Sequence, residues 1–222
     1  GVSGVDNVDC CNLALSRIGF GTQRPISALD STDNTEHAQA CVRVFPLIFR
    51  MVMEEFAWPF ARASAALALT SADAPSGWAY SYAMPADAAS VLFVEYDGFV
   101  PDWLNLNDHR NRWEVMADPS ASGQIICTDQ VDAWAFYVKD ITEVQFTNGL
   151  FFDALAWRLA GELGLGLKAE AKMYEKAVVY YNQAIETAIS KAKNQRGGTI
   201  RQPAETVVAH GGGLVQRDPW NP

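Results

Sequence analysis

The sequence has no long apolar run. Its longest apolar stretches, residues 65–69 and 88–94, are far shorter than the about 20 residues that a membrane-spanning helix needs. No positively charged and then apolar leader opens the chain, and position 5 is valine where the myristoylation pattern requires serine or threonine. We therefore expect a soluble protein that is made in a cytoplasm and has no membrane partner.

Few residues are of the kinds that form metal or catalytic sites. The cysteines show no CxxC spacing, which favours buried reduced thiols over a zinc site. The glycines at 211–213 precede no GK[ST], so they do not indicate a phosphate-binding loop. Adjacent Glu54 and Glu55 point about 100° apart on a helix and favour a solvated face over an acid and base pair. We predict no catalytic residue, cofactor or metal, and hence no enzyme. The cysteines and histidines are Cys10, Cys11, Cys41, Cys127, His37, His109 and His210.

Positive charge is also scarce. The chain has 17 Lys and Arg against 26 Asp and Glu, a net charge of −9. Residues 168–222 hold eight of the bases and five of the acids, which leaves nine bases and twenty-one acids in residues 1–167. Because affinity for the phosphate backbone comes from Lys and Arg, this acidic body argues against a surface that grips DNA.

The apolar content is sufficient for a real core. Of the 222 residues, 49% are hydrophobic and 11% aromatic, which indicates one large or two small domains. The clearest element is a helix from residue 169 to about 193, because apolar residues recur there at steps of three and four. We predict that it packs in the bundle through Tyr174, Val178, Tyr181 and Ile185.

Three further helices are predicted from caps and apolar spacing. Asp9 or Asn12 begins a short helix that runs to residue 18. One of the polar residues 31–35 caps a second helix that runs to about residue 55, and Pro46 inside it predicts a kink or a split. Thr147 or Asn148 begins the third, which glycines at 164 and 166 should end.

The middle of the chain has the pattern of short strands. Segments 61–70, 78–84, 91–96, 112–116, 124–128 and 133–138 are rich in β-branched and aromatic residues and are separated by turn residues. Asp118-Pro119 with Gly123 predicts one hairpin turn, and Asp97-Gly98 suggests another.

The chain ends in a segment without apolar periodicity. Residues 194–198 stop the last helix, and prolines and the three glycines follow. We expect a flexible arm, because its apolar residues have no local core to enter. We also expect a partner to order this arm, because Trp and Arg are favoured anchors of interfaces. Simple disorder is the alternative. The residues predicted to bind a partner are Arg196, Arg201, Leu214, Val215, Arg217 and Trp220.

Four stretches together resemble the tail tubular protein A family of tailed bacteriophages, the head-to-tail adaptor or connector proteins that sit beneath the portal. They are LALSRIGFGTQRPISALDSTDNTEHAQACVRVF from Leu13, EEFAWPFARASAALAL from Glu54, GWAYSYAMPADAASV from Gly77 and FFDALAWRLAGELGLGL from Phe151. The likeness covers most of residues 9–190 and lies in the order and spacing of these stretches.

The resemblance implies a helical bundle with an inserted β domain, assembled as a dodecameric ring between the portal and the tail tube or nozzle. Genome DNA would pass through the channel without specific binding, since a channel lined with carboxylates repels DNA. In relatives the C-terminal part commonly reaches toward the portal. The expected location is the tail or neck of the virion, after assembly in the host bacterial cytoplasm.

We therefore predict an α+β protein, mainly a helical bundle of about four helices with an inserted antiparallel β domain and an extended C-terminal arm. Residues 1–60 and 146–195 would form the bundle, 61–145 the β-rich insert and 196–222 the arm. Two alternative functions stay open. One is a tail-associated glycan hydrolase, which needs two carboxylates facing across a cleft. The other is a carbohydrate- or receptor-binding protein with Trp103 or Trp113 as a platform, although these are more readily core or ring-interface residues.

Overall fold

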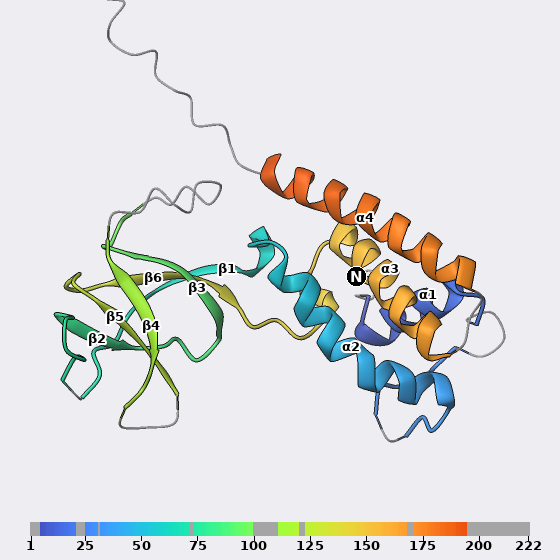
Figure 1. Cartoon of the computed structure of the whole chain (residues 1–222), viewed down its shortest axis with the longest axis horizontal. Coiled ribbons are helices and arrows are strands. Elements are labelled where there is room, and N and C mark those ends of the chain that lie inside the picture. The colour runs from blue at the N-terminus through green and yellow to red at the C-terminus, as the bar shows by residue number, and fades with distance from the viewer. Residues whose placement is uncertain are drawn as a thin grey trace, which may run out of the picture.

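The computed structural model describes residues 5–20, 25–30, 32–71, 73–99, 111–119, 123–167 and 171–194. Within these ranges the chain has four α-helices and two three-stranded antiparallel sheets (Figure 1). The predicted α+β class is therefore confirmed. The predicted C-terminal arm, residues 196–222, lies outside the described residues, as do Trp103, His109 and His210.

The first helix, α1, spans Asn7–Arg17 and begins one turn earlier than predicted. Its N-cap is Asp6, whose side chain accepts a hydrogen bond from the backbone N–H of Asp9 at 2.8 Å. The Asp9 side chain accepts one from the N–H of Asp6 at 3.1 Å, which completes a capping box. The prediction of Asp9 or Asn12 as the cap was wrong because Asp9 supports the cap from the third helical position.

The second helix, α2, spans Glu36–Glu54, and its N-cap is Thr35, one of the predicted candidates. The Thr35 hydroxyl accepts a hydrogen bond from the N–H of Ala38 at 3.2 Å. The helix continues through Pro46, so the alternative of a split into two helices was wrong. Phe45 and Ile48 are buried on either side of the proline, and their packing holds the helix together where one backbone hydrogen bond is missing.

The third helix, α3, spans Gly149–Gly166, and the fourth, α4, spans Ala171–Asn194. Asn148 caps α3 by accepting a hydrogen bond from the N–H of Phe151 at 2.9 Å, as predicted. Gly164 does not end the helix, because it lies inside the last turns and is buried. The α4 boundaries agree with the predicted helix within two residues.

Helix α3 is the centre of the helical part (Figure 1). It contacts α1, α2 and α4, and its side chains at Phe151, Leu155, Leu159 and Leu163 are fully or almost fully buried. The apolar residues of α3 go nearly all round the helix because it has neighbours on several sides. The other three helices bury one face each and leave one exposed.

Six strands lie between α2 and α3 in the chain. Their bounds are β1 Arg62–Ala66, β2 Tyr80–Ala83, β3 Ala88–Glu95, β4 Trp113–Ala117, β5 Gln124–Thr128 and β6 Trp134–Lys139. The strand orders are β1-β6-β3 and β2-β5-β4. Two short 3₁₀ turns flank the strands, η1 at Pro59–Ala61 and η2 at Val144–Phe146.

The turn between β4 and β5 is the predicted hairpin. The N–H of Asp118 donates to the carbonyl oxygen of Gly123 at 3.1 Å, and the two strands pair from Trp113 opposite Thr128 onward. The residues that would form the second strand of the suggested hairpin at Asp97-Gly98 lie outside the described residues, and among those described β3 pairs with β6. Gly98 does form a turn, at φ +80°.

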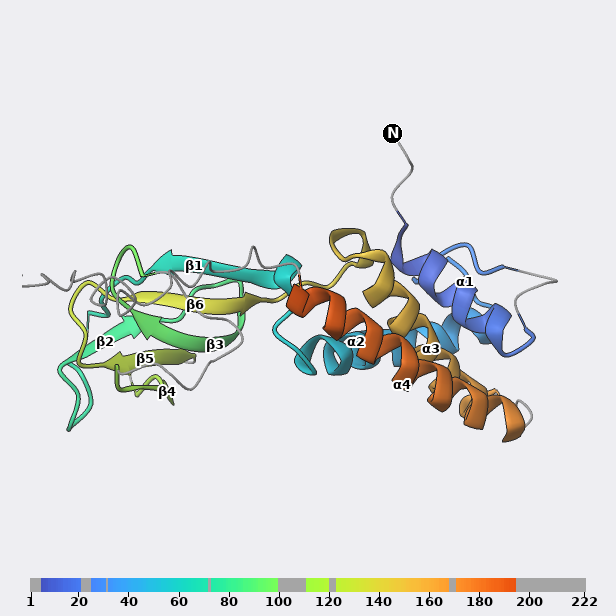
Figure 2. The ribbon, with the colours of Figure 1, turned by 90° about the horizontal axis from the view of Figure 1, so that it is seen from above.

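The two sheets are joined by the chain that follows β1. Leu69 forms an isolated bridge with Tyr82, and the N–H of Ala83 donates to the carbonyl oxygen of Ala68 at 2.8 Å. Tyr82 and Ile126 of one sheet and Tyr137 of the other share a second hydrophobic core. Figure 2 shows this β part beside the helices, joined to them by β1 and β6.

Candidate interaction surfaces

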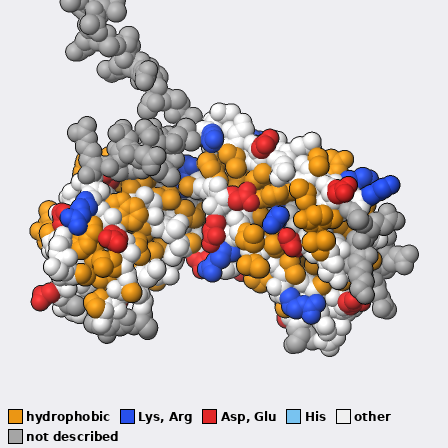
Figure 3. Space-filling view, viewed as in Figure 1, with side chains coloured by type: hydrophobic (Ala, Val, Ile, Leu, Met, Phe, Trp, Pro, Cys, Tyr) orange, Lys and Arg blue, Asp and Glu red, His pale blue; other side chains and the backbone are white. Residues whose placement is uncertain are grey.

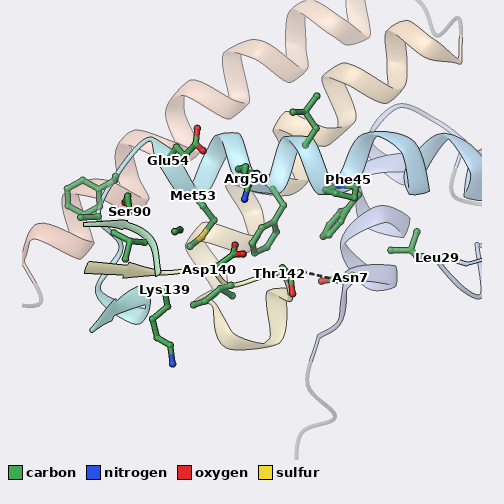
Figure 4. A pocket seen from close by; sticks show the side chains of 18 of the residues that line it. Asn7, Leu29, Phe45, Arg50, Met53, Glu54, Ser90, Lys139, Asp140 and Thr142 are labelled. Atoms are coloured by element: carbon green, nitrogen blue, oxygen red, sulfur yellow. Dashed lines mark hydrogen bonds between the residues drawn. The ribbon is translucent and has the colours of Figure 1, made fainter. Parts of the chain in front are cut away.

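A groove of about 1040 Å³ lies between α2 and the β part (Figure 4). The exposed and half-buried side of α2 forms one wall, the start of β3 with the end of β6 forms another, and the loop 140–142 forms the floor. Most of the lining is apolar. The apolar side chains include Val42, Leu47, Met53, Phe56, Leu92, Val138 and Ile141.

The groove exists because α2 carries apolar residues on its outer side as well as its inner side. The inner side, with Ile48 and Val52, is buried in the helical core. On two flanks of α2 that lie about 140° apart at 100° per residue, Leu47 is 62% exposed and Val42 is 40% exposed, and both line the groove. A surface helix in a monomer normally has a polar outer face, so exposed apolar residues beside a concave surface indicate an interaction site.

Irregular pairing of β3 shapes the opposite wall. The register of β3 against β6 shifts between Ala88 and Ser90 and again between Val91 and Phe93. The two residues that are skipped, at positions 89 and 92, both line the groove. A bulge re-aims the side chain at the extra position, and here both extra residues contribute to the lining of the groove.

The floor of the groove is tied to the start of α1. The side-chain amide of Asn7 donates to the carbonyl oxygen of Thr142 at 3.2 Å (Figure 4). Its Oδ1 accepts from the N–H of Val144 at 2.9 Å. The N–H of Asp140 donates to the carbonyl oxygen of Asp87 at 2.8 Å. Residues more than 130 positions apart thus hold the floor in place.

Charged side chains stand at the rim of the groove. Lys139 forms an ion pair with Asp87 at 3.1 Å. Glu54, Asp140 and Arg50 also line the groove, and none of the three has an ion pair among the residues that the structure describes. Figure 3 shows acidic and basic side chains gathered between the apolar surfaces of the helices and of the β part.

The Asp87 carboxylate also accepts a hydrogen bond from the Tyr137 hydroxyl at 2.8 Å. The hydrogen bonds from Tyr137 and Lys139 lower the pKa of Asp87. Burial, with a further contribution from Asp87, raises the pKa of Tyr137 to about 12. This network braces the β3 and β6 wall of the groove.

A second surface lies where α1, α3 and α4 meet. The Arg17 guanidinium sits over the Trp157 ring at 4.1 Å, and the Trp157 ring stacks on Tyr180 with centroids 4.7 Å apart. Arg17 is held by an ion pair to the Asp153 carboxylate and by a hydrogen bond to the Asp153 carbonyl oxygen at 2.9 Å. We call Arg17, Trp157 and Tyr180 the stack.

The outer end of the stack is exposed. Tyr180 is 45% exposed and the neighbouring Val179 is 53% exposed. We call these two α4 side chains the ridge. Trp, Tyr and Arg are the residue types enriched at the centres of protein interfaces, and an aromatic that is already stacked loses little entropy on binding. The ridge is therefore suited to be a binding anchor.

The structure places the predicted bundle residues on the inner part of α4. Tyr181 and Ile185 are buried in the helical core, and Tyr174 and Val178 are half-buried. The Tyr181 hydroxyl donates to the Glu55 carboxylate, so Glu55 is not simply a solvated residue as the sequence suggested. Burial and this hydrogen bond raise the pKa of Tyr181.

The cysteines are buried and free, as predicted. Burial raises the pKa of the Cys10 thiol to about 12, and a hydrogen bond with Cys41 and burial raise that of Cys11. Thiols of this kind are poor nucleophiles. Among the described residues no cluster of His, Cys, Asp and Glu could hold a metal ion, and His37 packs against the ring of Phe20.

Trp113, one of the two predicted platforms, is half-buried and packs against the core of the β part. A nearby cation–π pair was not predicted: the Arg112 guanidinium lies 4.0 Å from the centre of the Trp78 ring. Among the described helices none is long and apolar enough to cross a membrane.

Leu47, Trp157 and the ridge were missed by sequence reasoning. Val179 and Tyr180 fall outside the apolar stripe of α4, and Leu47 falls outside that of α2. Apolar residues that interrupt the polar face of an amphipathic helix were the available signal.

The described residues thus form an α+β chain with two apolar surfaces, one concave and one convex. A scan against models of protein families finds no match to the chain, and a search of curated protein sequences finds no significant match either.

Proposed function

We propose that this chain is a structural virion protein, a head-to-tail adaptor of a tailed bacteriophage. Copies of it would form a dodecameric ring between the portal and the tail tube or nozzle, with a channel for genome DNA. We also propose that a helical bundle carries the inserted β domain, and that residues 196–222 form the arm that reaches the portal.

The observation that carries the proposal is the open apolar groove between α2 and the β part. Its exposed Leu47 and Val42 would leave apolar area in water in an isolated subunit. In a permanent assembly, a structural subunit buries such apolar area against a neighbouring protein.

The order of the elements also supports the proposal. The strands lie between α2 and α3 in the chain, which agrees with the helices and inserted β part that the resemblance implies. The stretches that carry the resemblance fall on α1 and α2, on the β1 and β2 region and on α3. They therefore span both parts of the fold.

The decisive experiment measures the mass of the full chain by native mass spectrometry, alone and after mixing with a purified portal. We expect a portal-bound ring of twelve copies. A control mixture with a portal from an unrelated phage should give free subunit. Absence of any complex with the portal of the same phage would refute the adaptor function.

The arm is tested separately. Deletion of residues 197–222 should leave the unfolding transition of the body unchanged and weaken portal binding. The full-length variant Trp220→Ala should show a smaller loss in the same direction, because aromatic anchors carry much of an interface's energy. Unchanged portal binding by the deletion would remove the arm from the proposal but not the ring.

One observation favours the hydrolase alternative. Glu54 and Asp140 are carboxylates that line the same groove, Glu54 from the α2 wall and Asp140 from the floor. The mainly apolar lining offers a sugar few hydrogen-bond partners, so we favour protein binding. Turnover of bacterial cell-wall glycans by the wild type, lost in both Glu54→Gln and Asp140→Asn, would reverse that preference. The binding alternative has the Arg112 and Trp78 pair, and specific glycan-array binding abolished by Trp78→Ala would support it.

A further inference from the structure

The groove contains a backbone acceptor that lacks its regular helical donor. Pro46 lies inside α2 and has no N–H, so the carbonyl oxygen of Val42, one turn earlier, does not receive the hydrogen bond that a regular helix provides. Val42 and Pro46 are about 40° apart around the helix at 100° per residue, and both line the groove. The carbonyl oxygen between them therefore lies on the groove side of α2, where it can accept from a ligand.

The α2 wall around this oxygen suits an aromatic ring. Phe45, Phe49 and Met53 line the groove there, and the rings of Phe45 and Phe49 are tilted, with centroids 5.7 Å apart. Figure 4 shows Phe45 and Met53 pointing from α2 toward the loop that carries Asp140 and Thr142. Aromatic rings pack favourably on other rings in tilted or edge-on arrangements, and on thioether sulfur. A further aromatic side chain would extend this cluster.

The rim favours an occupant without net charge. The lining residues include two bases, Arg50 and Lys139, and two acids, Glu54 and Asp140, so their formal charges cancel. A strongly charged segment of either sign would meet like charges at this rim. Arg50 has no ion pair among the residues that the structure describes, so its guanidinium can lie against the face of an aromatic ring.

We infer that the groove binds a tryptophan side chain, presented by a neighbouring protein of the assembly on a segment without net charge. The indole N–H donates to the Val42 carbonyl oxygen, and the indole ring packs on Phe45, Phe49 and Met53. The groove, at about 1040 Å³, has room for the ring and its flanking residues. Tryptophan fits better than tyrosine, because a tyrosine hydroxyl also has acceptor lone pairs that an apolar wall leaves without a donor. This inference rests on the proposed function, since it states what the covering neighbour presents.

The site is tested with N-acetyltryptophanamide as the probe. The control is its 1-methylindole analogue, because the methyl group removes the indole N–H and leaves the ring. Binding of each molecule to the full chain is measured by an NMR titration that follows the resonances of the added molecule. We expect the probe to bind with a Kd on the order of 1 mM, and the analogue to bind about fivefold more weakly for want of one hydrogen bond.

Full-length variants locate the binding in the groove. Pro46→Ala gives α2 an N–H for the Val42 carbonyl oxygen, so we expect the probe and its analogue to bind this variant equally weakly. Arg50→Gln should weaken both molecules about threefold and keep the preference between them. Pro75→Ala is the matched control, because Pro75 lies in the β part outside the groove, and it should bind both molecules as the wild type does. Thermal melts check that each variant is folded.

Four results of the titrations would overturn the inference. They are a wild type without saturable probe binding, equal affinities of the wild type for the probe and its analogue, a preference for the probe that persists in Pro46→Ala, and stronger probe binding by Trp220→Phe. The last result would assign the groove to the tryptophan of this chain's own C-terminal segment.

Native mass spectrometry with the portal separates this inference from the adaptor function. We expect the portal-bound ring to form less completely with Pro46→Ala and with Arg50→Gln than with the wild type and Pro75→Ala. A ring that forms equally well with all four would reject the indole contact and leave the adaptor function intact. Absence of a ring with the wild type would refute the adaptor function, and the titrations would still decide whether the groove binds an indole.

Discussion

Replacement of Phe151 by alanine tests the packing that joins the two parts of the chain. Phe151 is fully buried and lies edge-on to Phe49, Trp58 and Phe60, with ring centroids 5.7, 5.1 and 5.2 Å away. Phe49 belongs to α2, Phe60 belongs to the η1 turn, and Trp58 lies just before this turn, which leads directly into β1. The ring of Phe151 therefore connects α3 to the entrance of the β part.

We expect Phe151→Ala to lower the free energy of unfolding by about 3–5 kcal/mol, from lost apolar transfer and the cavity left behind. Phe151→Leu keeps most of the volume and loses the edge-to-face contacts, so we expect a loss of about 2 kcal/mol. The control is Phe146→Ala, because the Phe146 side chain is 62% exposed and its removal should change stability by less than about 0.5 kcal/mol.

The measurement is equilibrium unfolding in urea, followed by tryptophan fluorescence. A lower midpoint with an unchanged slope reports lost stability rather than a change in the unfolded state. If Phe151→Ala changed stability by less than about 1 kcal/mol, or no more than Phe146→Ala, the cluster would not be the connection that we describe.

Burial raises the pKa of Tyr137 from 10 to about 12, so the Tyr137 hydroxyl loses its proton at a lower pH in the unfolded state than in the folded state. The free energy of unfolding should therefore fall as the pH rises from 10 to 12. Urea titrations should show a smaller fall in Tyr137→Phe. Hydrogen bonds, first from the N–H of Ser27 and then from Thr35, lower the pKa of Asp33 from 3.8 to about 2. That stabilisation is present above pH 4 and is lost toward pH 2, and an equal acid slope in Asp33→Asn would contradict it. The acidic body predicts no retention of DNA at low salt, and tight binding in a gel-shift assay would refute the repulsive channel.

The helices were largely predictable because their signals are local. The apolar spacing of residues 169–193 predicted α4, and Thr35 and Asn148 were among the predicted caps. A cap and a periodicity each depend on residues within four or five positions of one another. At the same range, the β4 and β5 hairpin was predicted from its turn residues.

Apart from the N-cap of α1, which is a local error, the features that were missed depend on distant segments. Pro46 does not split α2, because buried neighbours on both sides hold the helix in place. The pairing of β3 with β6, some forty residues later in the chain, was not predicted. Strand pairing of this kind depends on the packing of the whole sheet, which turn residues do not encode.

The α+β class, the positions of the helices and most strands, and the burial of the cysteines could be predicted from local patterns in the amino-acid sequence. The location of the interaction surfaces depends on how distant segments pack in the folded chain. Arg17 binds Asp153, which lies 136 positions later in the chain. Asn7 binds Thr142 in the floor of the groove, 135 positions later. Local patterns report which residues are apolar, but a groove and a ridge are formed by side chains from several elements, and packing alone brings those elements together.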